Sequence, residues 1–155
     1  MIFVKESLIR ASPERVFAFH ERPDALRSLT PPWERARVVE HAESLRAGAR
    51  AVVETRLFGL LPVRWVAVHT AYDPPRMFED VQESGPFRSW RHRHLFEPRE
   101  GGTLLRDEVE YEPPLGMLGR ALAPLLVVPR LTRLFEYRHE VTRAWCEAGD
   151  GGGLK

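Results

Sequence analysis

The most regular feature of the sequence is an alternation of apolar and polar residues with a period of two. It is clearest on the two sides of Gly101-Gly102, in residues 87–97 and 103–112. Successive side chains of a strand point to opposite faces, so this period predicts β-strands. Gly, Pro and Asp residues separate the runs, which predicts short antiparallel connections. The predicted strands cover residues 2–10, 35–43, 49–58, 63–73, 76–83, 87–97 and 103–112.

Helical signals lie near both ends of the chain. Ser12 followed by Pro13 has the pattern of an N-cap and a first helical residue, which predicts a short helix after the first strand. Residues 23–29 predict a second short helix. Towards the C-terminal end, apolar residues recur at helical spacing, so a long amphipathic helix is predicted over residues 129–147.

The segment that precedes the long helix, residues 116–128, is also apolar. Pro124 and Pro129 should kink or break it, so it is predicted as a shorter helical segment of its own. With these elements in sequence, residues 1–147 are expected to form a single domain. Residues 148–155 are rich in glycine and are expected to be a disordered tail.

The composition limits the class of protein. A chain of 155 residues that is 43% hydrophobic can bury a core as one domain. Its net charge of +1 gives no sign of a nucleic-acid partner. Cys146 is the only cysteine, which excludes an intramolecular disulfide, and the first residues lack a long apolar run. A cytoplasmic protein is therefore expected.

The hairpin around Gly101-Gly102 has an unusual inward face. Its outward face carries arginine and glutamate, which belong in water, and the opposite face combines aromatic and aliphatic residues with two histidines and an aspartate. A solid core excludes such polar groups unless they are paired, whereas an internal cavity can use them. The inward face is therefore expected to line a cavity, and it comprises Trp90, His92, His94, Phe96, Leu105, Asp107, Val109 and Tyr111.

Two readings are open for the polar residues of this face. If Phe96 lies opposite Thr103, the register of the hairpin puts His92 opposite Asp107, close enough for a hydrogen bond. An Asp–His pair that faces a cavity can act as a general acid or base. The structural alternative is that Asp107 satisfies a buried histidine in a partly polar core.

A metal site is a third reading of the same residues. His92 and His94 are two apart on one strand, point the same way and can share one ion. The third ligand would have to be Asp107 or His69. The sequence contains no cysteine cluster and no HExxH motif, so we expect no metal and no cofactor.

The order of the elements resembles the helix-grip fold of the SRPBCC superfamily. Local motifs resemble a bacterial cyclase/dehydrase-like branch of it, whose members are sometimes fused to nucleotide-sugar-epimerase-like domains. These motifs are Phe78-x-Asp80-x-Gln82, Gly85-Pro86-Phe87, Trp90-x-His92-x-His94-x-Phe96, Thr103, Asp107, Tyr111, Pro114-x-Gly116 and Tyr137-Arg138. The resemblance implies an α+β fold in which a curved antiparallel sheet of about seven strands wraps around the long C-terminal helix, with two short helices after the first strand.

The resemblance also implies a function. Superfamily members include START lipid-transfer domains and polyketide cyclases, so a hydrophobic or amphipathic small molecule (a lipid, a quinone or a polyketide-like aromatic) is expected between the sheet and the long helix. The alternative is a cyclase or dehydratase in which His92 and Asp107 are catalytic; a non-enzymatic binder is favoured. The expected ligand-binding residues are Trp65, His69, Trp90, His92, His94, Phe96, Asp107, Val109, Tyr111, Leu134, Phe135 and Arg138.

Three further expectations concern the surface and the long helix. Leu60 and Leu61 lie in a predicted loop, where polar residues are the norm, and predict a transient membrane or protein contact. An interaction module without a ligand is thus a further alternative, and the protein is expected to be a monomer or homodimer. Arg138 is expected to reach Asp80 or Glu83 and hold the helix to the sheet, or alternatively to bind an anionic ligand. His139 is expected to lie at the helix edge without a role.

Overall fold

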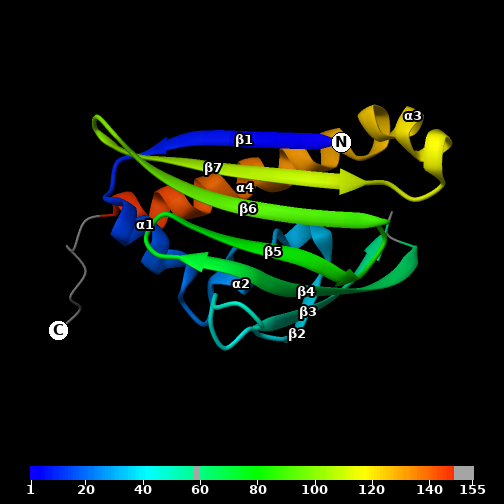
Figure 1. Cartoon of the computed structure of the whole chain (residues 1–155), viewed down its shortest axis with the longest axis horizontal. Helices are drawn as coiled ribbons and strands as arrows, with labels where there is room; N and C mark the ends of the chain where they lie inside the picture. The colour runs from blue at the N-terminus through cyan, green and yellow to red at the C-terminus, as the bar shows by residue number, and fades with distance from the viewer. Residues whose placement is uncertain (58–59, 149–155) are drawn as a thin grey trace.

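A seven-stranded antiparallel sheet forms the body of the protein (Figure 1). The structure is a computed structural model that describes residues 1–57 and 60–148. The order of the strands in the sheet is β1-β7-β6-β5-β4-β3-β2, so every neighbour in the meander from β2 to β7 is also next in sequence. The strands are β1 (Ile2–Ile9), β2 (Arg37–Glu40), β3 (Arg50–Leu57), β4 (Leu61–Asp73), β5 (Met77–Ser84), β6 (Ser89–Arg99) and β7 (Gly102–Glu112).

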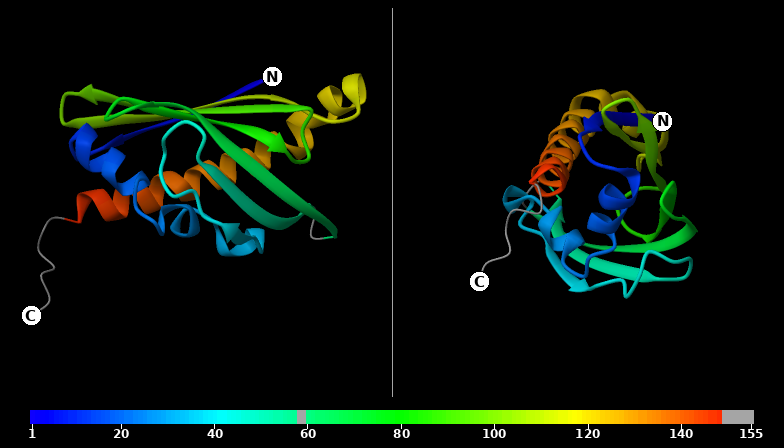
Figure 2. Two further views of the ribbon diagram at one scale, coloured as in Figure 1. Left: turned by 60° about the horizontal axis from the view of Figure 1, so that its bottom comes forward. Right: turned by 90° about the vertical axis from the view of Figure 1, so that its left-hand side faces the viewer.

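Two short helices follow β1, as predicted. Helix α1 (Pro13–His20) begins after Ser12, whose hydroxyl accepts a hydrogen bond from the Arg15 amide, so the N-cap pattern of the sequence is confirmed. Helix α2 (Ala25–Ser28) and the 3-10 turn η1 (Pro32–Glu34) continue over the concave side of the sheet (Figure 2).

The C-terminal part of the described chain is helical. Helix α3 (Gly116–Leu126) contains Pro124 two residues before its end, and helix α4 (Val128–Glu147) has Pro129 in its first turn. The two prolines therefore mark the break between the helices, as their effect on the backbone predicts. Figure 2 shows α4 lying along the concave face of the curved sheet, which is the helix-grip arrangement.

The outer face of the β6–β7 hairpin is a ladder of charged pairs. Arg91 donates a hydrogen bond to Glu110 at 2.7 Å, and Arg93 pairs with Glu108 on the same face. Arg106 extends the ladder to Glu6 on β1 at 2.6 Å. These exposed pairs contribute little stability each, but they fix which face of the hairpin points to water.

The predicted register of this hairpin is wrong by two residues. Phe96 lies opposite Leu105, and His94, in place of His92, lies opposite Asp107. The turn at Gly101 is tighter than predicted, because β6 continues to Arg99 and pairs there with Gly102. A slip of two keeps every side chain on its predicted face, so the inward and outward sets are unchanged.

The predicted tail, residues 148–155, lies outside the described residues except for Ala148, as does residue 58 at the end of the third predicted strand. Within the described chain, no helix is both long enough and apolar enough to cross a membrane.

Candidate functional site

A cavity of about 320 Å³ lies between the concave face of the sheet and the helices. Strands β3, β4 and β5 form its floor, α2 and η1 cover one side, and α4 closes the other. Most of the side chains that line it are apolar or aromatic, and three of the polar ones, Asp80, His92 and His94, lie together on β5 and β6. The apolar lining residues include Leu26, Ala67 and Phe87.

The predicted ligand-binding residues divide between the cavity wall and the core behind it. On the wall lie Trp65, His69, Trp90, His92, His94, Leu134 and Arg138. The other five predicted residues are buried without lining the cavity, because α1 and α4 pack directly on the part of the sheet that carries them. They are Phe96, Asp107, Val109, Tyr111 and Phe135.

Asp107 is the centre of a buried network of three histidines. Its Oδ1 accepts a hydrogen bond from Nε2 of His92 at 2.7 Å, and its Oδ2 accepts one from Nε2 of His139 at 2.7 Å. Nδ1 of His94 lies 2.9 Å from the same Oδ1, but the contact is bent and leaves this nitrogen without a hydrogen-bond partner among the described residues. The predicted His92–Asp107 pair is therefore present, although the two residues are diagonal neighbours and not directly opposed.

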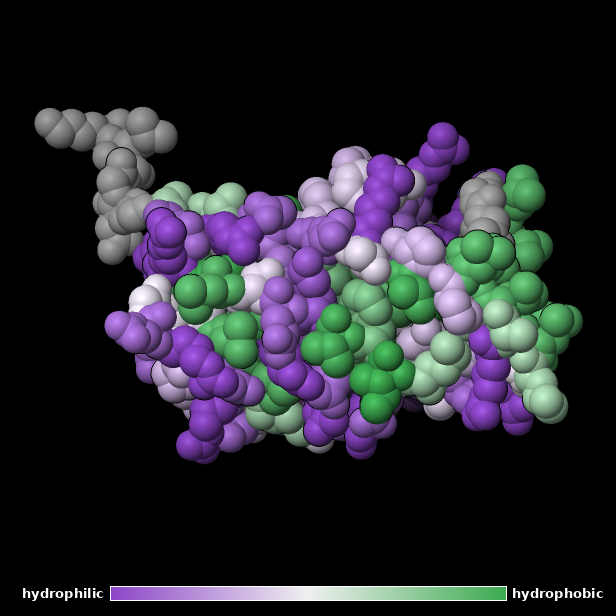
Figure 3. All heavy atoms as spheres, turned by 90° about the horizontal axis from the view of Figure 1, so that it is seen from above, coloured by the Kyte–Doolittle hydropathy of each residue, from purple (hydrophilic) through white to green (hydrophobic). Residues whose placement is uncertain are grey.

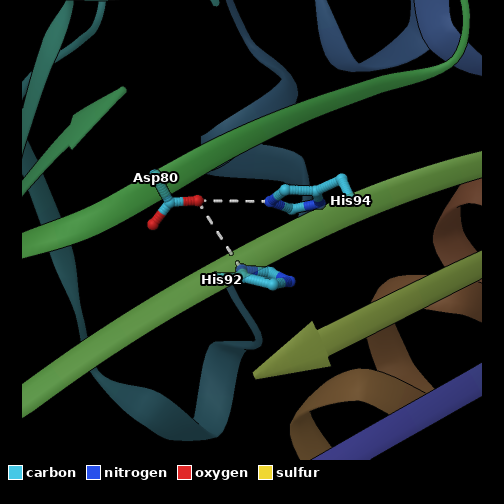
Figure 4. A group of neighbouring side chains, drawn as sticks. All are labelled: Asp80, His92 and His94. Atoms are coloured by element: carbon cyan, nitrogen blue, oxygen red, sulfur yellow. Dashed lines mark hydrogen bonds and ion pairs between the residues drawn. The ribbon is translucent and has the colours of Figure 1, made fainter. Parts of the chain in front are cut away.

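Asp80 faces the same two imidazoles from the other side. It lies on β5 directly opposite His92. Its Oδ2 is 3.3 Å from Nε2 of His94 and 3.7 Å from Nδ1 of His92 (Figure 4). Each imidazole of the His92-x-His94 pair thus has one nitrogen towards Asp107 and the other towards Asp80.

Aromatic neighbours hold the two imidazoles in place. The ring of Phe78, opposite His94 on β5, stacks on His94 with centroids 3.9 Å apart and an angle of 15° between the planes. The ring of Phe135 from α4 meets His92 edge to face at 5.1 Å. These contacts restrict the rotation of both histidines, so the four nitrogen atoms keep their directions.

Burial and the paired charges set the protonation of this network. Burial, followed by the nearby His94, lowers the pKa of His92 despite its bond to Asp107. Burial also opposes charge on His94, but Asp107 and Asp80 together raise its pKa. Burial acts against ionisation of both carboxyls too, and the surrounding histidines nevertheless lower the pKa of Asp80 and hold that of Asp107 well below its ordinary value.

Arg138 brings a cation to the cavity wall. Its Nε donates a hydrogen bond to the backbone carbonyl of Leu29 at 3.2 Å, and its guanidinium lies 5.4 Å from the ring centroid of Phe135. Burial lowers the pKa of Arg138, while Asp107 and Asp80 act in the opposite direction. The side chain thus ties α4 to the end of α2 through a carbonyl. The predicted bond to Asp80 or Glu83 is not among its described contacts, and Glu83 pairs with Arg50.

Sequence reasoning missed two members of the network, and a third histidine that packs against it. His139 was expected at the helix edge, but it is 1% exposed. Its Nδ1 also forms a hydrogen bond with Ser7 Oγ at 2.8 Å. It continues the buried stripe of Leu131 and Phe135 at intervals of four residues, and this spacing could have placed it inside. Asp80 is the second missed member; it alternates with Phe78 on β5, which is the signal that could have found it. His20 packs its ring against His94 and bonds to the Val16 carbonyl.

The cavity opens towards one end of the molecule. Glu34, Leu126 and Arg130 line the cavity and also a larger and more open depression of about 670 Å³ beside it, which we call the mouth. An ion pair between Arg130 and Glu34 spans the mouth from α4 to η1. Three more arginines line the outer depression, Arg35, Arg56 and Arg133.

Exposed apolar side chains gather at the same end. Figure 3 shows many of them as green side chains gathered over α3, and in Figures 1 and 2 the first residues of β4 lie at this end too. Leu60 is 78% exposed in a turn, as predicted. Leu61 is 62% exposed, but its predicted loop position is wrong, because it is the first residue of β4 and pairs with Leu57 of β3. On or next to α3, the exposed residues are Leu115, Met117, Leu118, Leu122, Leu125 and Leu126.

Comparison with known proteins gives the family. Residues 9–135 match the family model described as "Polyketide cyclase / dehydrase and lipid transport". No curated protein matches the chain.

Solved structures extend the likeness to nearly the whole chain. A protein of Thermus thermophilus is 23% identical with a TM-score of 0.69, over 94% of this chain and 99% of that one. A START superfamily protein of Mycobacterium smegmatis is 14% identical with a TM-score of 0.64, over 94% and 97%. A nucleoside-diphosphate sugar epimerase of Corynebacterium glutamicum is 26% identical with a TM-score of 0.69, over 92% of this chain but 28% of the epimerase. Because the family model covers most of the chain and the curved sheet grips α4 as in START-like structures, this protein belongs to the polyketide cyclase/dehydrase and lipid transport family of the SRPBCC superfamily.

Proposed function

We propose that the protein binds an amphipathic small molecule in the cavity between the sheet and α4. The observation that carries this proposal is the cavity itself, which is mostly apolar and has a compact set of polar groups on one wall. Such a composition is typical of small-molecule sites, where apolar walls give affinity and a few polar groups give orientation. The apolar part of the ligand would contact Trp65, Trp90 and Leu134, and its polar head would face His92, His94 and Arg138.

The size of the cavity narrows the class of ligand. About 320 Å³ is at the lower end of the ~300–1000 Å³ that ligand sites occupy. This favours a compact aromatic or isoprenoid molecule, such as a polyketide-like ring system or a quinone head, over a double-chain lipid. The Arg138 cation and the arginines at the mouth further favour a ligand that carries an anionic or strongly polarised oxygen.

The mouth suggests how the ligand enters. Leu126 of α3 lines the mouth beside Arg35, Arg56, Arg130 and Arg133, which make it basic. The other exposed leucines of α3 lie at the same end of the molecule. Apolar side chains beside arginines are suited to an anionic lipid surface, from which an apolar molecule could pass into the cavity without crossing water. The single described cysteine is free and buried, which suits a reducing compartment, and we propose the cytoplasm.

Mass spectrometry of the native protein, purified without detergent and measured before and after solvent extraction, tests the proposal. We expect one apolar molecule per chain to be released. Independently, the anionic aromatic dye 1-anilinonaphthalene-8-sulfonate should bind with one equivalent per folded chain and compete with the extracted molecule.

A pair of variants on one strand makes the test specific to the cavity. Ala67 lines the cavity and Thr70 is exposed on the same strand, so Ala67→Phe fills the cavity while Thr70→Phe adds the same ring to the surface. Ala67→Phe should lose the extracted molecule and the dye, and Thr70→Phe should keep both. Equal binding by the two folded variants would contradict the proposal.

A cyclase or dehydratase activity is a second candidate, favoured by one observation. The hydrogen-bonded pair of His92 and Asp107 lies at the cavity wall, where a proton can be exchanged with a bound molecule. In an enzyme, His92→Ala abolishes turnover of the molecule that the cavity holds. In a carrier, the same variant changes only affinity or selectivity.

A further inference from the structure

The residues that face Asp80 form a second, separate arrangement within the network. Among residues 1–57 and 60–148, Asp80, His92 and His94 each offer one ligand atom, and these three atoms lie within 4.8 Å of one another. Asp80 comes from β5 and the two histidines from β6, so three side chains of the same sheet face converge on one point (Figure 4). The convergence exists because Asp80 is directly opposite His92 in the β5–β6 register.

The distances match those between ligands of one metal ion. Ligand atoms that share a tetrahedral ion at bonds of about 2.1 Å are about 3.4 Å from one another. Asp80 Oδ2 is 3.3 Å from Nε2 of His94 and 3.7 Å from Nδ1 of His92. These two distances are within a few tenths of an ångström of that spacing, and the third pair, the two histidine nitrogens, lies within 4.8 Å.

Counting protons shows that the arrangement lacks positive charge. Each imidazole lies between two carboxylates, Asp80 on one side and Asp107 on the other, which makes four nitrogen–oxygen contacts. Two neutral imidazoles have only two protons for these four contacts. One added proton still leaves a nitrogen lone pair against a carboxylate, whereas one divalent ion on the Asp80 side completes both contacts there and leaves both protons for Asp107.

Asp107 has the place that a supporting carboxylate takes in metal sites. Metal-bound histidines almost always donate their other N–H to a carboxylate, a carbonyl or water, which fixes the tautomer. Here Asp107 Oδ1 lies 2.7 Å from Nε2 of His92 and 2.9 Å from Nδ1 of His94. Coordination through Nε2 of His94 would leave the proton on its Nδ1, the buried nitrogen that otherwise lacks a hydrogen-bond partner. His139 in turn holds the second oxygen of Asp107.

We propose that Asp80, His92 and His94 form a binding site for a divalent first-row transition metal ion such as Zn²⁺. Two imidazoles and one carboxylate suit these ions better than Mg²⁺ or Ca²⁺, which prefer oxygen ligands alone. All three residues line the cavity, so the remaining coordination positions face the space where a small molecule would bind. Three protein ligands with an open position are typical of sites at which an ion polarises a bound oxygen atom. The site goes beyond the proposed binding of an amphipathic ligand and does not depend on it.

The test is titration of tag-free, chelator-stripped protein with Zn²⁺ alone, in competition with a chromophoric chelator. One equivalent should bind per chain. Co²⁺ in place of Zn²⁺ should give visible absorption bands of a four- or five-coordinate site containing nitrogen ligands. Binding of either ion should raise the melting temperature, because only the folded chain presents the converged ligands.

Variants separate this site from other histidines of the cavity. Asp80→Asn and His92→Gln should each weaken Zn²⁺ binding on the order of 100-fold or more, beyond the ~10–100-fold expected for Asp107→Asn behind the ligands. His69→Gln is the matched control, because His69 also lines the cavity but its Nδ1 is bonded to the carbonyl of Leu45. It should keep full affinity and the cobalt spectrum.

Two outcomes would overturn the metal site. One is a wild-type affinity no higher than that of the folded double variant Asp80→Asn/His92→Gln. The other is a cobalt spectrum that His69→Gln changes and Asp80→Asn does not. Neither outcome affects the dye and extraction experiments, which measure ligand binding in the cavity without metal.

Discussion

The two halves of the sheet have the same alternating pattern and the opposite outcome. On β7 and the turn end of β6 the inward side chains pack directly against α1 and α4. Phe96, Leu105 and Val109 on these strands and Phe135 on α4 are all at most 1% exposed. On β3, β4, β5 and the other end of β6 the inward side chains line a cavity. The difference arises because α4 contacts the β1 side of the sheet, while α2, η1 and one side of α4 border the cavity over the curved opposite side. A strand pattern therefore predicts which face points inward but not whether that face is filled.

The polar network lies on the boundary between the two halves. Asp107 belongs to the packed side, where it is 4% exposed and bonded to two histidines, and Asp80 belongs to the cavity side. His92 and His94 link them. The same pair of imidazoles can thus support the core through one carboxylate and present a binding site to the cavity through the other.

The largest expected effect compares two neighbours on α4. Phe135 is fully buried in the packed half, and Leu134 lines the cavity. Phe135→Ala should lower the free energy of unfolding by about 3–5 kcal/mol, because it leaves a void in a close-packed region. Leu134→Ala should cost about 1 kcal/mol, because its site already borders empty space. Urea denaturation of both variants measures the difference, and equal losses would show that the two halves do not differ in packing.

The next effect compares the two carboxylates of the network. Asp107→Asn should lower the free energy of unfolding by about 2–3 kcal/mol, since an amide cannot accept from three imidazoles without turning its own N–H towards one of them. Asp80→Asn should cost about 1 kcal/mol or less in metal-free buffer, since Asp80 borders the cavity. The measurement is thermal or urea unfolding in the presence of a chelator. A larger loss for Asp80→Asn than for Asp107→Asn would contradict the prediction, because it would show that stability depends more on Asp80 than on Asp107.

A pH dependence of stability should come from His20, which is buried at the end of α1 and borders the cavity. Its Nδ1 donates to the Val16 carbonyl at 2.8 Å, and its ring packs against Phe78, Phe96 and His94. Burial, with the nearby His94, lowers the pKa of His20 from 6.5 to about 3, while the Val16 carbonyl and Asp107 act in the opposite direction and His139 in the same. Between these values the unfolded chain binds the proton and the folded chain does not, so stability falls as pH falls.

For this group alone, the loss between pH 6.5 and about pH 4.5 should be about 2 kcal/mol. The check is urea denaturation of wild type and of His20→Gln at both pH values. The variant cannot titrate at this position, so its loss of stability should be smaller than that of wild type by this amount. Parallel losses would mean that His20 is protonated in the folded protein.

The smallest effect on stability is expected at the mouth of the cavity. Leu60→Ser with Leu61→Ser should change the free energy of unfolding by less than about 0.5 kcal/mol, because both side chains are exposed. Binding of the anilinonaphthalene dye should also be unchanged. The double variant should no longer sediment with vesicles that contain anionic lipid. The control variant Thr70→Phe, on the outer face of β4, should still sediment with them. Loss of dye binding in the double variant would instead place these leucines inside the ligand site.

The prediction from sequence was strongest where a pattern is local. The seven strands, the N-cap at Ser12 and the separation of α3 from α4 at its two prolines all follow from neighbouring residues, and each is present. The inward and outward faces of the β6–β7 hairpin were also predicted, because a slip of two residues leaves them unchanged. The register itself was not, since the position of a turn depends on one or two residues around Gly101.

The polar residues of the candidate site were predicted in part, again where the pattern is local. The sequence alone determined that His92, His94 and Asp107 share an inward face, because the period of a strand is fixed by covalent geometry. Only the tertiary structure decided that Asp80 on β5 and His139 on α4 reach these residues, and that α4 lies close to one half of the sheet and leaves a cavity over the other. Those contacts join segments that are distant in sequence. They depend on the curvature of the sheet and on the path of α4, and no local pattern encodes either of these.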